Sequence, residues 1–315
     1  MSLPGYSHEA LLASSIEDLV GGTAAWLRAG LEVGEDAVVI GDRGQGSALA
    51  DAVGDFRVMV LDQADVYGKP VKTLGFMGDF VRDRVAAGSR RVRMVGAVDF
   101  GATAESGEDW QQYEAVCNAV LAELPLWSVC VYDTHRLSAP HVETAALTHP
   151  LLRSPTGMTT ASPSYADPRE VLAVRRVNTP APTAAARYSI TGSHQLAGLR
   201  AWLRQQLARH LPSGGGSREQ RQDDFVLAVD EVATNALRHG RPPVHLGIRV
   251  DPDQLTCTVT DQGAGLTDPL VGWTVPNHPA ASTSGRGLWL ARHLCDRVTP
   301  VHAPEGFSIR LQLNR

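Results

Sequence analysis

A carboxylate and a carboxamide stand four residues apart near the C-terminus, in the segment 223–240. On an α-helix, Glu231 and Asn235 would leave the same face one turn apart. That helix is predicted by an apolar stripe at helical spacing, formed by Phe225, Val229, Val232 and Ala236. Its end is predicted at Gly240, which two prolines follow closely. A carboxylate beside an amide oxygen suits a general base next to a ligand for a hard cation.

Two glycine-containing turns follow this helix. A strand predicted over 255–260 runs into Asp261, which could accept a hydrogen bond from an amine. Gly263 and Gly265 come next and would let the backbone approach a flat ligand closely. The second turn leads into a helix predicted over 289–295 and consists of Gly285, Arg286, Gly287 and Leu288. The opening of a helix presents free N–H groups and a positive dipole end, so this turn favours a phosphate.

The three motifs, E-x-x-x-N, D-x-G-x-G and G-x-G-L, resemble the N, G1 and G2 boxes of the GHKL ATPases (gyrase, histidine kinase and MutL relatives). Over residues 187–315 the chain looks most like the anti-sigma-factor serine/threonine kinases of the RsbW type. The resemblance implies ATP and Mg²⁺ as cofactors. It makes Glu231 the base that activates a partner's serine or threonine, Asn235 the Mg²⁺ ligand, and Asp261 the reader of the adenine amino group.

The same resemblance implies further contacts to the nucleotide from Gly263, Gly265, Gly285, Arg286, Gly287 and Leu288. Ser308, on the strand predicted over 307–313, stands where relatives often carry a threonine near the adenine. The segment 266–284 contains three prolines and is expected to form a mobile lid over the nucleotide. Helices on one side of a mixed, largely antiparallel sheet would give an α/β two-layer sandwich.

The composition sets wider bounds. A length of 315 residues suggests two domains, and 43% hydrophobic with 20% charged residues describes a soluble globular protein. The net charge of −5 argues against direct binding to nucleic acid. We find neither a signal peptide nor a long apolar run, so we expect a cytoplasmic protein without a membrane span. The cysteines lack C-x-x-C spacing and are expected to be buried and reduced: Cys117, Cys130, Cys257 and Cys295.

The N-terminal half alternates strands with helices, which predicts a mostly parallel sheet covered on both faces. Strands are expected at 37–40, 56–61, 92–98 and 127–132, and helices at 73–87 and 108–124. The glycine-rich segment 41–47 lies between a predicted strand and a predicted helix, which invites a phosphate-binding interpretation. It lacks the lysine of a Walker A motif, so we interpret it as a tight turn.

Several short motifs in this half resemble the MEDS sensory domain, named for methanogen and methylotroph sensors. They are His8-Glu9-Ala10-Leu11, 34–38, 92–96, Tyr113-Glu114-Ala115, 130–134, His149-Pro150 and 162–165. The resemblance covers about residues 5–175 and implies a P-loop-like three-layer core without a nucleotide motif, which senses a small molecule or relays a protein signal. Candidate ligand-site residues are His8, Tyr113, Glu114, Asp133 and His135. A metal site made of His8, Asp133 and His135 is not expected, because no further nearby ligand supports it.

The expected organisation is therefore a sensory domain at 1–176, a Pro- and Ala-rich linker at 177–187 and a GHKL ATPase domain at 188–315. Histidine autophosphorylation is not expected. His194 is followed by a glutamine, and only one helix fits between the linker and the glycine-rich segment 212–217.

The resemblance instead implies an ATP-dependent serine/threonine kinase. Its substrate would be an anti-anti-sigma (STAS) protein, a sigma factor would be held inactive, and the kinase would form a homodimer. Two alternatives stay open. The chain could be a catalytically silent, ATP-loaded switch that sequesters a sigma factor or another regulator. The N-terminal domain could also be a small-molecule receptor whose output is the ATPase half.

Overall fold

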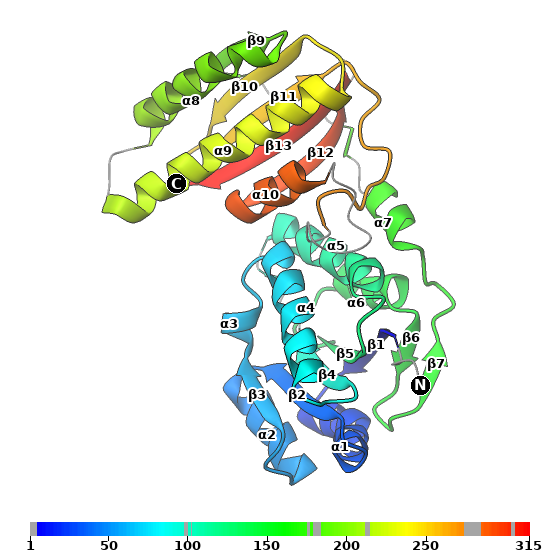
Figure 1. Ribbon diagram of the computed structural model, residues 1–315. Helices are drawn as coiled ribbons and strands as arrows, with labels where there is room; N and C mark the ends of the chain where they lie inside the picture. Colours follow the sequence, from blue (N-terminus) through cyan, green and yellow to red (C-terminus); the bar gives the residue numbers. More distant parts are fainter. Residues whose placement is uncertain are drawn as a thin grey trace. The chain divides into compact units, whose positions relative to one another are not determined.

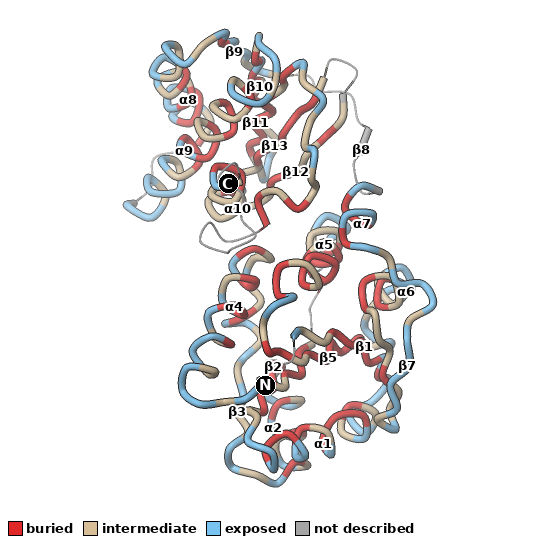
Figure 2. Tube along the Cα trace, turned by 45° about the vertical axis from the view of Figure 1, so that its right-hand side comes forward, coloured by how far each residue is buried: buried red, intermediate tan, exposed pale blue. Residues whose placement is uncertain are grey.

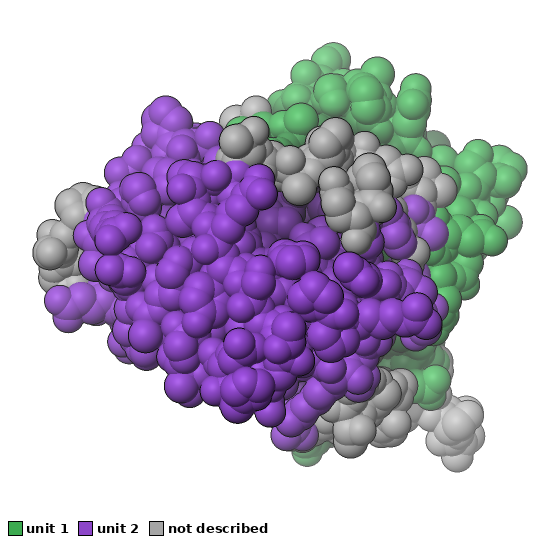
Figure 3. All heavy atoms as spheres, turned by 90° about the horizontal axis from the view of Figure 1, so that it is seen from above, with its two compact units in different colours: residues 1–172 green, residues 173–315 purple. Residues whose placement is uncertain are grey.

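A computed structural model describes most of the chain. The chain is divided into two compact units, residues 1–172 and 173–315 (Figure 3). The described residues are 5–97, 100–101, 103–174, 177–178, 184–211, 215–273, 285–303 and 306–315. Each unit has its own sheet and its own core.

The first unit is built on a seven-stranded sheet with the order β3-β2-β4-β5-β1-β6-β7. The strands are β1 Ser7–Ala13, β2 Asp36–Gly41, β3 Met59–Asp62, β4 Val92–Ala97, β5 Leu126–Asp133, β6 Leu151–Arg153 and β7 Thr159–Ala161. All neighbouring strands are parallel except β6 and β7, which are antiparallel. Buried residues concentrate along the central strands β1, β2 and β5, as expected for strands covered on both faces (Figure 2).

Helices cover both faces of this sheet (Figure 1). They are α1 Ile16–Glu32, α2 Arg43–Val53, α3 Gln63–Val66, α4 Pro70–Ala86, α5 Ala104–Val120 and α6 Ala139–Thr148. Helix α7, Pro168–Val174, follows and spans the boundary between the two units. Helices α1 and α2 pack together on one face, whereas α5 packs between α4 and α6 on the other. The predicted three-layer, mostly parallel domain is confirmed.

The glycine-rich segment between β2 and α2 folds differently from the expected turn. Helix α2 begins at Arg43, directly after Asp42, whose side chain accepts a hydrogen bond from the Gln45 N–H group at 2.8 Å. This N-cap stabilises the first turn and draws Gly44 and Gly46 into the helix. The expectation of a loop over 41–47 is therefore wrong, and no backbone cradle for a phosphate forms at these residues.

The second unit contains a six-stranded sheet with the order β8-β12-β13-β11-β10-β9. The strands are β8 Val177–Asn178, β9 Ala186–Ile190, β10 Val244–Val250, β11 Gln254–Asp261, β12 Arg297–Ala303 and β13 Gly306–Asn314. Every pairing is antiparallel except that of β8 with β12. In the segment 177–187 that the sequence assigns to a linker, β8 lies at the start and β9 begins at the end, while residues 179–183 are outside the described part.

One face of this sheet carries a short 3₁₀ turn, η1, and three helices (Figure 1). They are η1 Ser193–Gln195, α8 Leu196–His210, α9 Gly215–His239 and α10 Arg286–Leu294. The predicted two-layer sandwich is confirmed. Helix α9 begins eight residues before the expected start, and its predicted apolar stripe is buried against the sheet: Phe225, Val229, Val232 and Ala236.

The segment expected to form a lid begins with a packed turn. Leu270 and Trp273 are buried, and the guanidinium of Arg292 stacks 4.2 Å from the centre of the Trp273 ring. Gly272 lies against Leu288, so residues 266–273 are anchored to α10. The rest of the expected lid, residues 274–284, lies outside the described residues.

Two expectations from composition can be checked directly. All four cysteines are buried and free, which confirms the prediction of reduced thiols. Within the described ranges, every helix is too short or too polar to cross a membrane.

Candidate functional site

Helix α9 presents Glu231 and Asn235 on one face, as the sequence predicts. Both side chains are half-buried, and neither makes a hydrogen bond to another described residue. Gly287 on α10 closes over them, because a Cβ atom there would lie 2.7 Å from Asn235 Nδ2 and 2.8 Å from Glu231 Oε2. The structure therefore brings the E-x-x-x-N and G-x-G-L motifs into direct contact, and a larger residue at position 287 would have to displace these side chains.

The N-terminus of α10 forms an anion-favouring edge beside this pair. Gly285 is the N-cap residue, and its carbonyl accepts the first helical hydrogen bond, from Trp289 at 3.0 Å. The N–H groups of the first turn have no partner within the helix and lie at the positive end of its dipole. Arg286 is exposed at the same end and adds a full positive charge. The N–H groups of the first turn and the Arg286 side chain together suit the binding of a phosphate.

Asp261 ends β11 and is only 7% exposed. Its Oδ1 atom accepts hydrogen bonds from the N–H groups of Gly263 at 2.6 Å and Arg241 at 3.4 Å. All its hydrogen bonds to described residues use this one oxygen, so the carboxylate is held in place while Oδ2 keeps its acceptor capacity. Gly240 and Gly263 crowd the carboxylate so closely that neither could carry a side chain without displacing it.

A cavity of about 70 Å³ opens between α9 and the sheet. Val259, Phe307 and Ile309 supply apolar surface, and Asp261 and Asn235 supply polar groups. Gly265 lines it too and adopts a positive φ of 90°, and a Cβ atom there would lie 2.6 Å from the Phe307 ring. A carboxylate beside an apolar wall suits a flat aromatic ring that carries an amine.

Ser308 does not reach this cavity. Its neighbours Phe307 and Ile309 line the pocket, and side chains alternate between the two faces of a strand. Ser308 therefore lies on the opposite face of the sheet, where its hydroxyl bonds to Thr260 Oγ1 at 2.7 Å. Its placement beside the adenine, expected from the sequence, does not agree with the structure.

Leu288 also has a different role from the one expected. Its side chain is 3% exposed and packs against Gly272 and the core of the second unit. This packing orients α10, so the Leu288 side chain positions the first turn of the helix.

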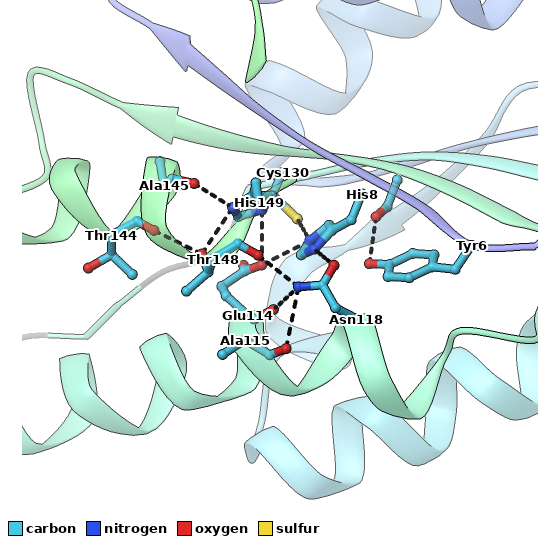
Figure 4. A network of polar contacts seen from close by, with 11 residues as sticks. Tyr6, His8, Glu114, Ala115, Asn118, Cys130, Thr144, Ala145, Thr148 and His149 are labelled. Carbon is cyan, nitrogen blue, oxygen red and sulfur yellow. Dashed lines mark hydrogen bonds and ion pairs between the residues drawn. The ribbon is translucent and has the colours of Figure 1, made fainter. Parts of the chain in front are cut away.

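In the first unit, the structure brings together two of the five candidate ligand-site residues. His8 on β1 and Glu114 on α5 are buried, with His8 Nε2 3.2 Å from Glu114 Oε2 (Figure 4). Two further side chains complete the cluster. Cys130 Sγ on β5 lies 3.3 Å from His8 Nε2, and His149 Nε2, just after α6, lies 3.3 Å from Glu114 Oε2.

The other three candidates lie apart from this cluster. Tyr113 packs edge-on against Trp110, with ring centres 5.2 Å apart. Asp133 caps a turn by accepting hydrogen bonds from the N–H groups of His135 and Arg136, and His135 is exposed. His8 pairs with Ser128 on β5, and Asp133 lies five residues farther along that strand, so Asp133 is remote from the cluster. Sequence reasoning included Cys130 and His149 in motifs but missed them as site residues, since only the fold joins them to His8.

Burial dominates the electrostatics of the cluster. It lowers the pKa of His8 to about 4, with a further contribution from the facing His149. Burial raises the pKa of the Cys130 thiol well above its usual value. At neutral pH His8 is therefore a neutral imidazole and Cys130 a thiol.

Comparison with protein families gives a match for each unit. Residues 7–150 match the MEDS domain, the methanogen/methylotroph, DcmR sensory domain. Residues 193–313 match the histidine kinase-like ATPase domain. Comparison with curated proteins gives no match. The chain thus joins a MEDS sensory domain at the N-terminus to an ATP-using, kinase-like regulatory domain at the C-terminus.

Proposed function

We propose that this chain is a signal-regulated protein serine/threonine kinase, in which the MEDS domain controls phosphoryl transfer from ATP to an anti-anti-sigma (STAS) partner. The observation that carries the proposal is the environment of Glu231. This carboxylate is half-buried, makes no hydrogen bond to a described residue, and stands one turn from Asn235 beside the first turn of α10. A site that only bound a nucleotide would have no use for a free carboxylate there.

Each neighbouring group fits one task in this reaction. Asp261 offers its second carboxylate oxygen to an amine at the wall of the apolar cavity. Asn235 offers an amide oxygen to Mg²⁺, and the first turn of α10 with Arg286 faces the phosphates. ATP with Mg²⁺ would supply the phosphoryl group to be transferred. Glu231 would accept the proton of the attacking hydroxyl, which places it in the role of general base.

The surroundings of His194 favour a serine or threonine as the acceptor over a histidine of this chain. His194 is exposed in the 3₁₀ turn η1, and only α8 separates this turn from α9 in the described part of the second unit. Among the described residues, no helical hairpin presents it as a phosphoacceptor. The hydroxyl would therefore come from another protein, and we propose that the same surface also holds a sigma factor inactive and that the kinase acts as a homodimer.

Radiolabel transfer tests this function. The full chain is incubated with γ-labelled ATP, Mg²⁺ and a panel of STAS-domain proteins. The proposal expects label on a serine or threonine of a STAS protein, lost in Glu231→Ala and kept in Glu219→Ala, an exposed glutamate on the same helix. A chain that binds ATP but labels nothing would instead be the catalytically silent partner switch.

A further inference from the structure

Glu114 is a buried carboxylate without the partners that such a group needs. Its side chain is fully buried, and neither carboxylate oxygen makes a hydrogen bond within the described residues. Glu9, on β1 of the same unit, shows the usual solution. It is equally buried but pairs with Arg153 at 2.7 Å and accepts a hydrogen bond from Trp127 at 2.5 Å. Because an unpaired buried charge is unfavourable, Glu114 needs either a proton or a compensating cation.

The hydrogen bonds of the two histidines beside Glu114 use their Nδ1 atoms and leave Nε2 facing the carboxylate. His8 Nδ1 lies 3.1 Å from the side-chain oxygen of Asn118. The Asn118 amide nitrogen donates to the Thr148 carbonyl at 2.7 Å, which fixes its oxygen as the acceptor toward His8. His8 therefore carries its proton on Nδ1, and its Nε2 atom directs a lone pair at Glu114.

His149 is oriented in the same way. Its Nδ1 atom lies 3.0 Å from the Ala145 carbonyl, which can only accept, so the proton is again on Nδ1. Its Nε2 atom is buried, has no hydrogen-bond partner among the described residues, and faces Glu114 Oε2. Two imidazole lone pairs and a carboxylate thus point into one small space (Figure 4). Unless a proton or a metal ion lies between them, these groups repel one another.

Cys130 completes a four-ligand set. The donor atoms of His8, Glu114, Cys130 and His149 all lie within 4.8 Å of one another. Three of the separations are 3.2 to 3.3 Å. A tetrahedral zinc ion with ligands at 2.0 to 2.3 Å holds its ligand atoms about 3.3 to 3.6 Å apart. The contacts already present therefore have about the size of the edges of a zinc tetrahedron.

We propose that His8, Glu114, Cys130 and His149 form a Zn²⁺ site that ties β1, α5, β5 and the end of α6 together. Two neutral imidazoles, a carboxylate and a thiolate would neutralise the charge of the ion, so the buried site would carry no net charge. The hydrogen bonds from Nδ1 to Asn118 and to the Ala145 carbonyl hold both rings with Nε2 toward the ion, as is usual for metal-bound histidines. Mg²⁺ and Ca²⁺ prefer oxygen ligands and fit this set poorly.

The first test measures metal in the full chain. We expect the protein purified without chelator, or stripped and reloaded with Zn²⁺, to hold one ion per chain. Co²⁺ in its place should give the absorption of a tetrahedral centre with a thiolate charge-transfer band. That band should disappear in Cys130→Ser and remain in Cys117→Ser, a matched change at a buried cysteine outside the cluster. A folded wild-type chain that takes up neither ion, or a band that survives in Cys130→Ser, overturns the proposal.

A second variant separates the metal site from a merely structural role of Glu114. In Glu114→Gln the new amide can donate to an Nε2 atom that lacks a partner, and the buried charge is removed. We therefore expect the metal-free variant to melt at the same temperature as the metal-free wild type or higher. Zn²⁺ should raise the melting temperature of the wild type and leave that of the variant nearly unchanged. A variant that is destabilised without metal, or equally stabilised by Zn²⁺, contradicts the proposal.

Discussion

Gly287 on α10 lies against the side chain of Asn235 on α9, and a Cβ atom at Gly287 would stand 2.7 Å from Asn235 Nδ2. The carboxylate of Glu231 is equally close, at 2.8 Å. One glycine therefore sets the distance between the carboxylate–amide pair and the anion-favouring end of a helix. The two motifs are separated by about fifty residues in the sequence and act as one site because of this contact.

Gly287→Ala should weaken ATP binding. The added methyl group must push Asn235 and Glu231 aside, and overpacking of this kind costs roughly 1–3 kcal/mol, which corresponds to at least about a fivefold loss of affinity. Calorimetric titration with ATP measures this loss of affinity. The matched control is Gly75→Ala in α4, where a Cβ meets nothing within 4 Å. The control should bind ATP normally and gain about 0.5–1 kcal/mol of stability. Unchanged ATP affinity in Gly287→Ala would mean that α10 is not part of the site.

Glu231→Ala should separate binding from chemistry. Removal of a general base lowers a transfer rate by roughly 10²- to 10⁴-fold, whereas ATP affinity should change little, because Asp261 and α10 carry the nucleotide contacts. Single-turnover transfer and equilibrium titration give the two quantities. Glu219→Ala, on the exposed face of α9, should leave both unchanged. A Glu231→Ala variant that transfers at the wild-type rate would remove this residue from the mechanism.

The apolar stripe of α9 should dominate the stability of the second unit. Phe225 is fully buried, so Phe225→Ala is expected to cost about 3–5 kcal/mol. Leu227 on the same helix is 43% exposed, and Leu227→Ala should cost less than about 1 kcal/mol. Denaturant unfolding of the full chain, followed in the transition of this unit, compares the two. Similar losses for both variants would contradict the docking of α9 through this stripe.

The helices and sheets could be predicted from the sequence because their signals are local. The 4-3-4 stripe of α9 and the apolar runs of β2 and β5 each lie within one element. The start of α2 could not be placed from the glycines alone, because the Asp42 N-cap outweighed their preference for a turn.

The roles of individual residues were harder to predict, because they depend on which face of a strand a side chain takes and on which elements the fold brings together. Ser308 was expected near the adenine, but a shift of one residue along a strand reverses the face, and Phe307 and Ile309 take that side. The cluster around Glu114 joins four elements whose residues are far apart in the chain. No local pattern links Cys130 and His149 to His8, so only the topology of the parallel sheet reveals them.

The buried thiols should be unreactive while the chain is folded. Burial raises the pKa of Cys257 to about 12, so at pH 8 roughly one molecule in ten thousand carries the reactive thiolate there. Burial also raises the pKa of Cys117 and Cys130 well above the usual value. We expect slow reaction with a disulfide reagent in the native state and reaction of all four cysteines in denaturant. A thiol that reacts rapidly in the folded chain would contradict this burial.

The most direct test of the nucleotide site is calorimetric titration of Mg·ATP into the full wild-type chain and into Asp261→Asn. The substitution keeps the size of the side chain, so the fold should be retained, but the Oδ2 position can become an amide that repels the amine of adenine. We predict saturable binding by the wild type and its loss in Asp261→Asn. Equal binding by both proteins, or no binding by a folded wild-type chain, would contradict the site at α9, β11 and α10.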